Sequence, residues 1–97
     1  MKKINLTISG CMGRMGQQLI KSAKSNKNFK LSSLTENRTI NKKINGIRPE
    51  LNSENAFKKS EVIIDFTSPN CTIEILRIAS KLKKKVVIGT TGFNQRQ

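Results

Sequence analysis

The sequence predicts an α/β fold built on a parallel, doubly wound β-sheet. Apolar β-branched segments alternate along the chain with segments whose apolar residues recur at helical spacing, which is typical of strands joined by helical crossovers. Two of these segments, residues 62–64 and 86–88, are apolar at every position, as strands buried on both faces are. A glycine-rich loop at residues 10–16 separates the first apolar segment from the first helical pattern.

The first half of the chain is expected to form a strand, a helix and a second strand. Ile4–Ser9 alternates apolar residues with polar ones, several of them β-branched, and is predicted to be a strand. A helix is predicted from Arg14 to about Ser25 by apolar residues at helical spacing: Met15, Leu19, Ile20 and Ala23. Phe29–Thr35 is the second predicted strand. The polar residues 36–52 are expected to be irregular, with a weak edge strand around Ile44–Arg48.

The second half of the chain is expected to repeat the alternation of helix and strand. Ser53 is a predicted N-cap for a short helix through Lys59, and Val62–Phe66 is a predicted strand. Residues 68–70 open a further helix with Pro69 in its first turn, and one apolar face is expected from Ile75, Leu76, Ala79 and Leu82. Lys85–Gly89 is the last predicted strand, and we expect the sheet to be incomplete at its carboxyl-terminal end.

The chain is strongly basic, with 19 Lys+Arg against 6 Asp+Glu and a formal net charge of +13. Such an excess is compatible with nucleic acid, an anionic membrane surface or a phosphorylated ligand as partner. The lysines are scattered, however, and no aromatic residues that stack on bases lie among them. This distribution favours a solvated basic surface, and we expect neither a nucleic-acid nor a membrane partner.

The residue types that are present restrict the chemistry. The chain has no His, and its two cysteines, Cys11 and Cys71, lack metal-ligand spacing, so neither His-based catalysis nor a metal site is expected. Cys71 falls in the first turn of a predicted helix, where a thiolate is stabilised, but a small buried residue is the favoured interpretation. Cys11 is interpreted as a tolerated side chain of the glycine loop. Without a signal peptide or a membrane-spanning apolar run, we expect a reducing cytoplasm and free thiols.

The glycine loop has the residues that a bound pyrophosphate requires. Gly10 can make a tight turn, Gly13 has no side chain to obstruct phosphates, and Gly16 lets the helix pack closely on the strand. The helix amino terminus presents free N–H groups and a partial positive charge. Arg14 in this first turn either contacts a phosphate or is a solvated surface residue. The glycine spacing is one residue longer than the common dinucleotide fingerprint.

The end of the second predicted strand carries a candidate ribose ligand. Glu36 lies about 20 residues beyond the glycine loop, where a dinucleotide site needs a carboxylate for the adenosine ribose hydroxyls. The alternative is an ordinary loop carboxylate. Asn37 and Arg38 follow, and a cation here is able to pair with a 2′-phosphate. The combination predicts tolerance of both NADH and NADPH.

Two further strand ends carry polar or small residues. Asp65 and Thr67 either contribute to the site or cap the following helix. Gly89 permits a close approach of the backbone to a ligand, and Thr90 and Thr91 offer hydroxyls near a nicotinamide or a ribose. Because ligands of doubly wound sheets bind beyond the carboxyl ends of the strands, all these residues are expected at one edge.

Three blocks of sequence, residues 10–16, 65–69 and 87–93, together resemble the N-terminal part of the dihydrodipicolinate reductase family. The resemblance runs from Ile4 to the end of the chain. It implies a Rossmann-type dinucleotide-binding domain and hydride transfer from NADPH or NADH to a cyclic dihydropyridine-type dicarboxylate. The reaction belongs to the diaminopimelate route of lysine biosynthesis.

The resemblance implies a set of cofactor contacts. Residues 10–15 would hold the pyrophosphate, Glu36 the adenosine ribose, and residues 89–91 would lie near the nicotinamide half. The complete set is Gly10, Cys11, Met12, Gly13, Arg14, Met15, Glu36, Asn37, Arg38, Gly89, Thr90 and Thr91. The family often carries an Arg directly after the acidic residue. Here that position is Asn37 and the cation is Arg38, which leaves the preference between NADH and NADPH open.

The resemblance also implies parts that this sequence lacks. The family has a second domain with a His-rich motif, a catalytic His and a Lys, and it forms homotetramers. We therefore expect residues 1–97 to be a truncated dinucleotide-binding domain without catalytic residues, which binds a dinucleotide weakly and does not complete the reaction. The alternatives are a stand-alone dinucleotide-binding module without catalysis and a basic nucleic-acid-binding protein.

Overall fold

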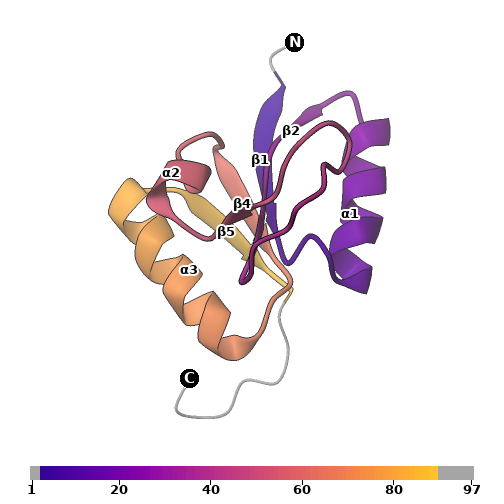
Figure 1. Ribbon diagram of the computed structural model, residues 1–97. Coiled ribbons are helices and arrows are strands. Elements are labelled where there is room, and N and C mark those ends of the chain that lie inside the picture. Colours follow the sequence, from indigo (N-terminus) through magenta and orange to yellow (C-terminus); the bar gives the residue numbers. More distant parts are fainter. Residues whose placement is uncertain (1–2, 90–97) are drawn as a thin grey trace.

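The computed structural model describes residues 3–89, which form a five-stranded sheet with helices on both faces (Figure 1). In chain order the elements are β1 (Ile4–Ser9), α1 (Arg14–Ser25), β2 (Phe29–Glu36), β3 (Glu50–Leu51), α2 (Glu54–Phe57), β4 (Val62–Asp65), α3 (Pro69–Leu82) and β5 (Lys85–Ile88). The strand order is β3-β2-β1-β4-β5, and every neighbouring pair is parallel. The chain winds outward from β1 in both directions, which confirms the predicted doubly wound sheet.

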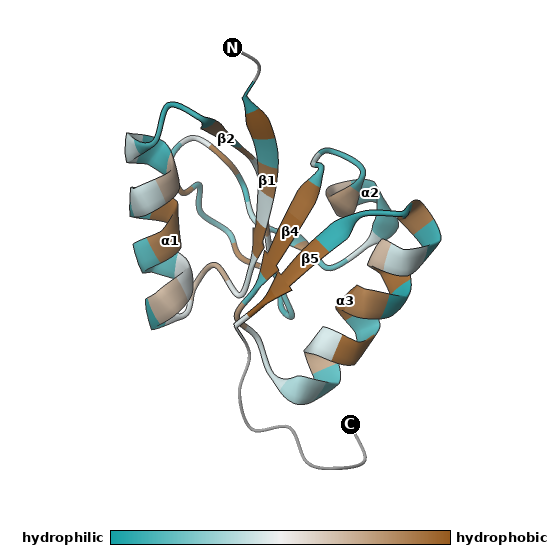
Figure 2. Cartoon of the chain, turned by 180° about the vertical axis from the view of Figure 1, so that it is seen from behind, coloured by the Kyte–Doolittle hydropathy of each residue, from teal (hydrophilic) through white to brown (hydrophobic). Residues whose placement is uncertain are grey.

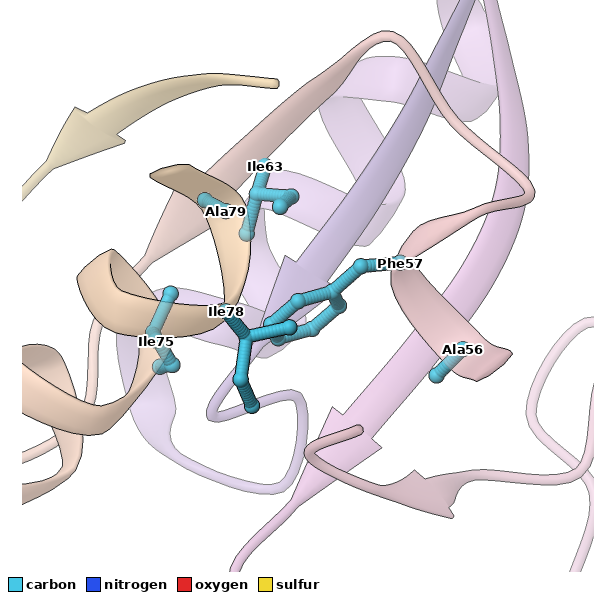
Figure 3. Packing of buried hydrophobic residues seen from close by; sticks show 6 residues of the cluster. All are labelled: Ala56, Phe57, Ile63, Ile75, Ile78 and Ala79. Carbon is cyan, nitrogen blue, oxygen red and sulfur yellow. The ribbon is translucent and has the colours of Figure 1, made fainter. Parts of the chain in front are cut away.

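Two hydrophobic clusters pack on opposite faces of the sheet. The α1 cluster consists of Ile8, Cys11, Ile20 and Leu34. The α3 cluster consists of Ala56, Phe57, Ile63, Ile75, Ile78 and Ala79, and in Figure 3 the Phe57 ring of α2 points toward Ile78 of α3. Ile8 and Ile64 are register partners, so the neighbouring Ile63 faces the other side of the sheet. The fully buried Phe57 therefore fastens α2 and α3 to the face opposite α1.

Local signals determine where α3 begins and ends. Ser68 is its N-cap and accepts from the Cys71 N–H at 3.5 Å, and Pro69 occupies the first helical position. The capping role offered above for Asp65 and Thr67 thus belongs to Ser68. The helix ends at Leu82, and the φ of 58° at its C-cap Lys83 lies in the left-handed region, which stops further helical hydrogen bonding.

The edge strand predicted around Ile44–Arg48 is wrong. Ile44 and Ile47 exchange two backbone hydrogen bonds of 2.8 and 2.9 Å and close a tight turn. Asn45 and Gly46, with φ of 52° and 78°, form this turn, and an Asn-Gly pair favours such positive values. The edge strand is β3, which follows the turn and pairs Glu50–Leu51 with the end of β2.

Two residues expected on apolar helix faces are largely exposed. Met15 of α1 is 52% exposed, and Leu76 of α3 is 40% exposed. Each lies at the margin of its helix's apolar face, whereas Ile20 and Ile75 face the sheet and are buried. The buried faces of α1 and α3 are therefore narrower than helical spacing alone predicts.

One part of the α1 face of the sheet has no helix over it. Figure 2 shows the apolar strands β4 and β5 between α1 and α3, with no helix in front of them. An apolar hollow of about 270 Å³ lies here, bounded by α1, β1, β4 and β5. Val87 lines this hollow and is 56% exposed, so the expectation that residues 86–88 are buried on both faces is wrong. In residues 3–89, β5 is also the edge of the sheet on this side.

Membrane-spanning helices and metal-ligand clusters are both absent from residues 3–89. None of the helices in this range combines the length and apolarity that crossing a bilayer requires. No group of three His, Cys, Asp or Glu side chains within residues 3–89 is arranged to hold a metal ion. Both cysteines are free thiols, Cys11 buried and Cys71 half-buried, so Cys71 is less buried than the sequence suggested.

Candidate functional site

The carboxyl ends of β1, β2, β4 and β5 meet at one edge of the sheet. Backbone hydrogen bonds join them there: Gly10 N–H donates to the Thr35 carbonyl at 3.0 Å and Phe66 N–H to the Ser9 carbonyl at 3.1 Å. Gly89 N–H donates to the Asp65 carbonyl at 2.8 Å. The topology thus brings together the segments after four strands, as expected for the ligand edge of a doubly wound sheet.

Gly10 and Gly16 are required by the fold of the loop. Gly10 has a φ of +83°, and a Cβ there would lie 2.3 Å from the Phe66 carbonyl oxygen. A Cβ on Gly16 would lie 2.1 Å from the Gly10 carbonyl oxygen. Both contacts are with backbone atoms that cannot rotate away, so these two glycines permit the turn and the close packing of α1.

Gly13 differs, because the fold does not need a glycine there. A Cβ would meet only the Gly10 carbonyl oxygen at 3.4 Å, an ordinary contact. The residue is the N-cap of α1 with a φ of −75°, which every amino acid adopts, and no side chain caps the helix. The missing side chain therefore leaves open space over the first turn of α1, on the solvent side.

The backbone N–H groups of the loop and the first turn of α1 differ in whether they have an acceptor within the described residues. All four N–H groups of residues 10–13 donate within the protein, to Thr35, Glu36 or Gly10. The N–H groups of residues 14–16 have no acceptor among residues 3–89, as expected for a first helical turn without a side-chain cap. Together with the helix dipole, these three donors form a site for an anion.

Glu36 lies directly against the glycine loop. Its Oε2 accepts from the Met12 N–H at 2.9 Å, and its Oε1 accepts from the Asn37 N–H at 3.1 Å. Each carboxylate oxygen has a second lone pair that can accept a further hydrogen bond, so Glu36 can also receive hydroxyl groups. The juxtaposition of this carboxylate with the loop is the one a dinucleotide site requires.

A basic hollow adjoins Met12, the residue whose N–H donates to Glu36. It has a volume of about 470 Å³ and is lined by Met12, Arg38, Thr39, Ile40, Asn41 and Lys42. Arg38 is exposed at its rim, and Asn37 is exposed next to it. The segment after β2 thus offers cations and open space next to the carboxylate that faces the loop.

Cys11 belongs to the core and faces away from the open side of the loop. Its side chain is fully buried against Ile8, Ile20 and Leu34. Burial and then the negative charge of Glu36 raise the pKa of this thiol from 9.0 to about 11. Its N–H donates to the Thr35 carbonyl at 3.3 Å. The interpretation of Cys11 as a merely tolerated side chain is corrected, because its thiol fills the α1 cluster.

Asp65 connects the end of β4 to the start of α3. Its buried carboxylate accepts from the Thr67 N–H at 3.0 Å and from the Thr67 hydroxyl at 2.6 Å. The Thr72 hydroxyl, in the second turn of α3, donates to the other carboxylate oxygen. These bonds account for Asp65 and Thr67 as residues that position the loop before α3.

Gly89 approaches a side chain of the same edge. A Cβ at this position would lie 2.1 Å from a carbon of the Phe66 ring, so the absence of a side chain is explained by that ring. Thr90 and Thr91, expected near the nicotinamide half, lie outside the described residues. The described part of the candidate site therefore consists of the glycine loop, Glu36 and the residues around them.

Two polar side chains at this edge were not predicted from the sequence. Gln17 Nε2 donates to the Met12 carbonyl at 2.9 Å and supports the glycine loop from the first turns of α1. Asn52 Oδ1 accepts from the Ser9 hydroxyl at 2.7 Å beneath the end of β1. Gln17 was detectable, since it lies four residues after Gly13 on the turn that follows the loop. Asn52 carries no comparable signal.

Known proteins resemble this chain in sequence and in fold. Residues 4–97 match the family described as dihydrodipicolinate reductase, N-terminus. The 4-hydroxy-tetrahydrodipicolinate reductase of Pelagibacter ubique (strain HTCC1062) is 73% identical over 97 residues, covering 100% of this chain and 38% of that protein. The protein of the same name from Buchnera aphidicola subsp. Cinara cedri (strain Cc) is 38% identical over 107 residues, covering 98% and 39%.

A solved structure supports the same assignment. The dipicolinate-bound dihydrodipicolinate reductase of Paenisporosarcina sp. TG-14 matches with a TM-score of 0.78 and 25% identity, over 97% of this chain and 40% of that chain. This chain spans 38% to 40% of the length of the three proteins compared. The doubly wound sheet, the glycine loop facing Glu36 and these matches together show that the chain belongs to the dihydrodipicolinate reductase family, of which it represents the N-terminal part.

Proposed function

We propose that this chain is the dinucleotide-binding part of an NADPH- or NADH-dependent reductase. The substrate would be 4-hydroxy-tetrahydrodipicolinate, which the names of the similar proteins contain, in the diaminopimelate route to lysine. The observation that carries the proposal is the open first turn of α1, with its three free N–H groups and the Glu36 carboxylate beside it. This arrangement suits a pyrophosphate with an adjoining ribose.

The residues present fit such a cofactor. The N–H groups of residues 14–16 would hold the pyrophosphate, with the Arg14 guanidinium as an added cation. Glu36 would accept from the adenosine ribose hydroxyls, with Asn37 and Arg38 beside them. Residues 89–91 would lie near the nicotinamide half. The bound cofactor supplies the hydride, and the residues of this chain bind and orient it.

The proposed activity needs more than this chain. With 38% of the length of its Pelagibacter relative, the chain holds the proposed cofactor site, and the dicarboxylate site and the tetramer contacts would belong to the remaining length. We expect this chain alone to show no substrate-dependent oxidation of NADPH. A cytoplasmic location and residues 1–97 as one truncated domain are part of the same proposal.

A titration of NADPH and NADH against the chain tests the cofactor site. We expect saturable binding of both, and Gly13→Ala is expected to weaken both roughly tenfold, because its Cβ enters the anion site that faces the charged phosphates. The melting temperature of this variant should stay close to that of the wild type, since the Cβ meets only an ordinary contact.

Gly46→Ala is a matched control for this titration. Gly46 has a φ of +78° with open space around it, and it lies in the turn after Asn45 rather than at the loop. We expect this variant to have a lower melting temperature than the wild type and to bind both nucleotides with unchanged affinity. Absence of saturable binding to the wild type, or equal affinities of the Gly13→Ala variant and the wild type, would contradict the proposed site.

A further inference from the structure

The positive charge of the chain is concentrated in its first half. Residues 3–49 hold a single carboxylate, Glu36, which already accepts from two backbone N–H groups. The same residues hold ten cations, Lys3, Arg14, Lys21, Lys24, Lys27, Lys30, Arg38, Lys42, Lys43 and Arg48. The three ion pairs of the described part of the chain all lie at residues 50–81. The cations of residues 3–49 are therefore available to an external anion.

Two hollows lie along this basic segment, and the first of them adjoins the candidate site. The first, described above, adjoins Met12 and has Arg38 and Lys42 in its lining. The second, of about 480 Å³, lies between α1 and the same segment and contains Lys42 and Lys43 in its lining. Met12 and Lys42 line both hollows, and no carboxylate lines either of them. Lys42 thus stands where the two hollows meet.

The position of the first hollow determines which anion it suits. The Met12 N–H is bonded to the Glu36 carboxylate, so the hollow adjoins the place proposed for the adenosine ribose. A phosphate esterified to the ribose 2′-oxygen would lie next to that carboxylate, and the repulsion between the two must be offset by cations. Position 37 is Asn and supplies none, whereas Arg38 and Lys42 both line the hollow.

We propose that Lys42 is a specificity-determining residue that binds the 2′-phosphate of NADPH together with Arg38. This inference rests on the proposed dinucleotide site and names one of its contacts. An ammonium group pairs with a phosphate oxygen as a charge-assisted donor, and NADH offers no phosphate at this position. Lys42 accordingly contributes to the affinity for NADPH and leaves that for NADH unchanged.

The test compares two neighbouring lysines. Dissociation constants for NADPH, NADH, 2′,5′-ADP and 5′-AMP are measured with the wild-type chain, Lys42→Gln and Lys43→Gln at one ionic strength. Lys42→Gln is expected to weaken NADPH and 2′,5′-ADP roughly tenfold, since it removes one charge-assisted contact. NADH and 5′-AMP should change by less than about twofold. Lys43→Gln removes the same charge one residue away and should change none of the four by more than that.

The outcomes separate this inference from the function on which it rests. If the wild type binds neither NADPH nor NADH, the proposed function fails. If both bind and Lys42→Gln weakens them equally, or affects neither, Lys42 is not the 2′-phosphate ligand and the dinucleotide site still stands. Lys42→Arg, which keeps the charge, should retain most of the affinity for NADPH, and a loss as large as that of Lys42→Gln would also overturn the assignment.

Discussion

Gly10, Gly13 and Gly16 look equivalent in the sequence but serve different purposes in the loop. Backbone atoms exclude a Cβ at Gly10, where the Phe66 carbonyl lies too close, and at Gly16, where the Gly10 carbonyl does, whereas a Cβ at Gly13 would make only an ordinary contact. Two of the glycines are therefore a requirement of folding, and the third keeps space open for a ligand. Substitutions at Gly10 and Gly16 should thus affect stability, whereas a substitution at Gly13 should affect binding.

Gly16→Ala is expected to destabilise the fold. The added Cβ would lie 2.1 Å from the Gly10 carbonyl oxygen and 2.9 Å from the Cys11 Cα, so α1 must move away from β1. Overpacking against backbone of this kind typically costs ~2–3 kcal/mol. Chemical denaturation of the wild type, Gly16→Ala and Gly13→Ala measures the difference. Equal unfolding free energies for the two variants would show that the loop accommodates both substitutions alike.

The buried thiol of Cys11 predicts a stability that falls at alkaline pH. Its pKa is about 11 in the folded chain against an ordinary value of 9.0, so the unfolded chain loses this proton first. The free energy of unfolding should therefore decrease as the pH rises from 9.0 to about 11, by up to ~3 kcal/mol. Denaturant titrations across this range measure the effect. The Cys11→Ala variant serves as the reference, because it keeps the titrating lysines and lacks only the thiol. Parallel pH profiles for the two proteins would contradict this prediction.

The same burial predicts unequal reactivity of the two thiols. Cys71 is half-buried at the start of α3, whereas Cys11 is fully buried and its raised pKa disfavours the thiolate. We expect a disulfide reagent to label Cys71 in the folded chain and Cys11 only after denaturation. Mass spectrometry of the peptides shows which cysteine is labelled. Labelling of Cys11 in the folded chain would show that the α1 cluster opens readily.

At the scale of elements, the loop between β4 and α3 is held by a buried carboxylate. Asp65 accepts from the backbone and hydroxyl of Thr67 and from the hydroxyl of Thr72, which lies beyond the Ser68 cap. The start of α3 therefore has two supports, the cap and the carboxylate. Because the carboxylate is buried and the cap is exposed, their contributions should differ.

Substitution of each support measures this difference. Asp65→Ala leaves the Thr72 hydroxyl buried without its acceptor and is expected to cost ~2–3 kcal/mol of stability. Ser68→Ala removes only the N-cap bond and is expected to cost ~1 kcal/mol. Urea denaturation of the two variants provides the comparison. A larger loss for Ser68→Ala than for Asp65→Ala would reverse this ranking.

The elements that could be predicted are those with several buried positions. The periodicity of residues 14–25 and 69–82 and the apolar run of β4 reflect burial against the sheet and so locate these elements directly. The apolar run of β5 also predicts a strand, although Val87 and Ile88 are exposed there. The segment around Ile44 is different, because its two isoleucines pack from a turn and mimic a short strand. Here Asn45 and Gly46 outweigh the apolar pattern through their positive φ.

The candidate site could be predicted as far as topology determines it. Parallel strands place their carboxyl ends together, so the meeting of the glycine loop and Glu36 follows from the strand order. The burial of Cys11 and the hydrogen bond of Asn52 depend on the path of the backbone between strands, which no periodic pattern records. Lys42 resembles every other exposed lysine until the hollow beside Met12 is known.

At the scale of the whole molecule, the apolar hollow beside β5 predicts association between copies of this chain. Val87 and Ile88 are exposed on a strand that has no further partner within residues 3–89. We expect Val87→Lys to shift the population toward monomers, because a charge cannot be buried there without a partner. Sedimentation velocity at increasing concentration measures this, and a dimer fraction unchanged by the substitution would place the contact elsewhere.

The unpaired cations of residues 3–49 have a consequence that reaches beyond any single contact. Their combined field extends into solvent over about a Debye length, ~10 Å at 0.1 M salt, and draws anionic nucleotides toward the loop before contact. Salt should therefore slow the association of NADPH and leave its dissociation rate nearly unchanged. The same field repels other copies of a chain with a net charge of +13, so salt should promote self-association. Higher ionic strength thus slows the binding of NADPH and favours the association of two copies of the chain.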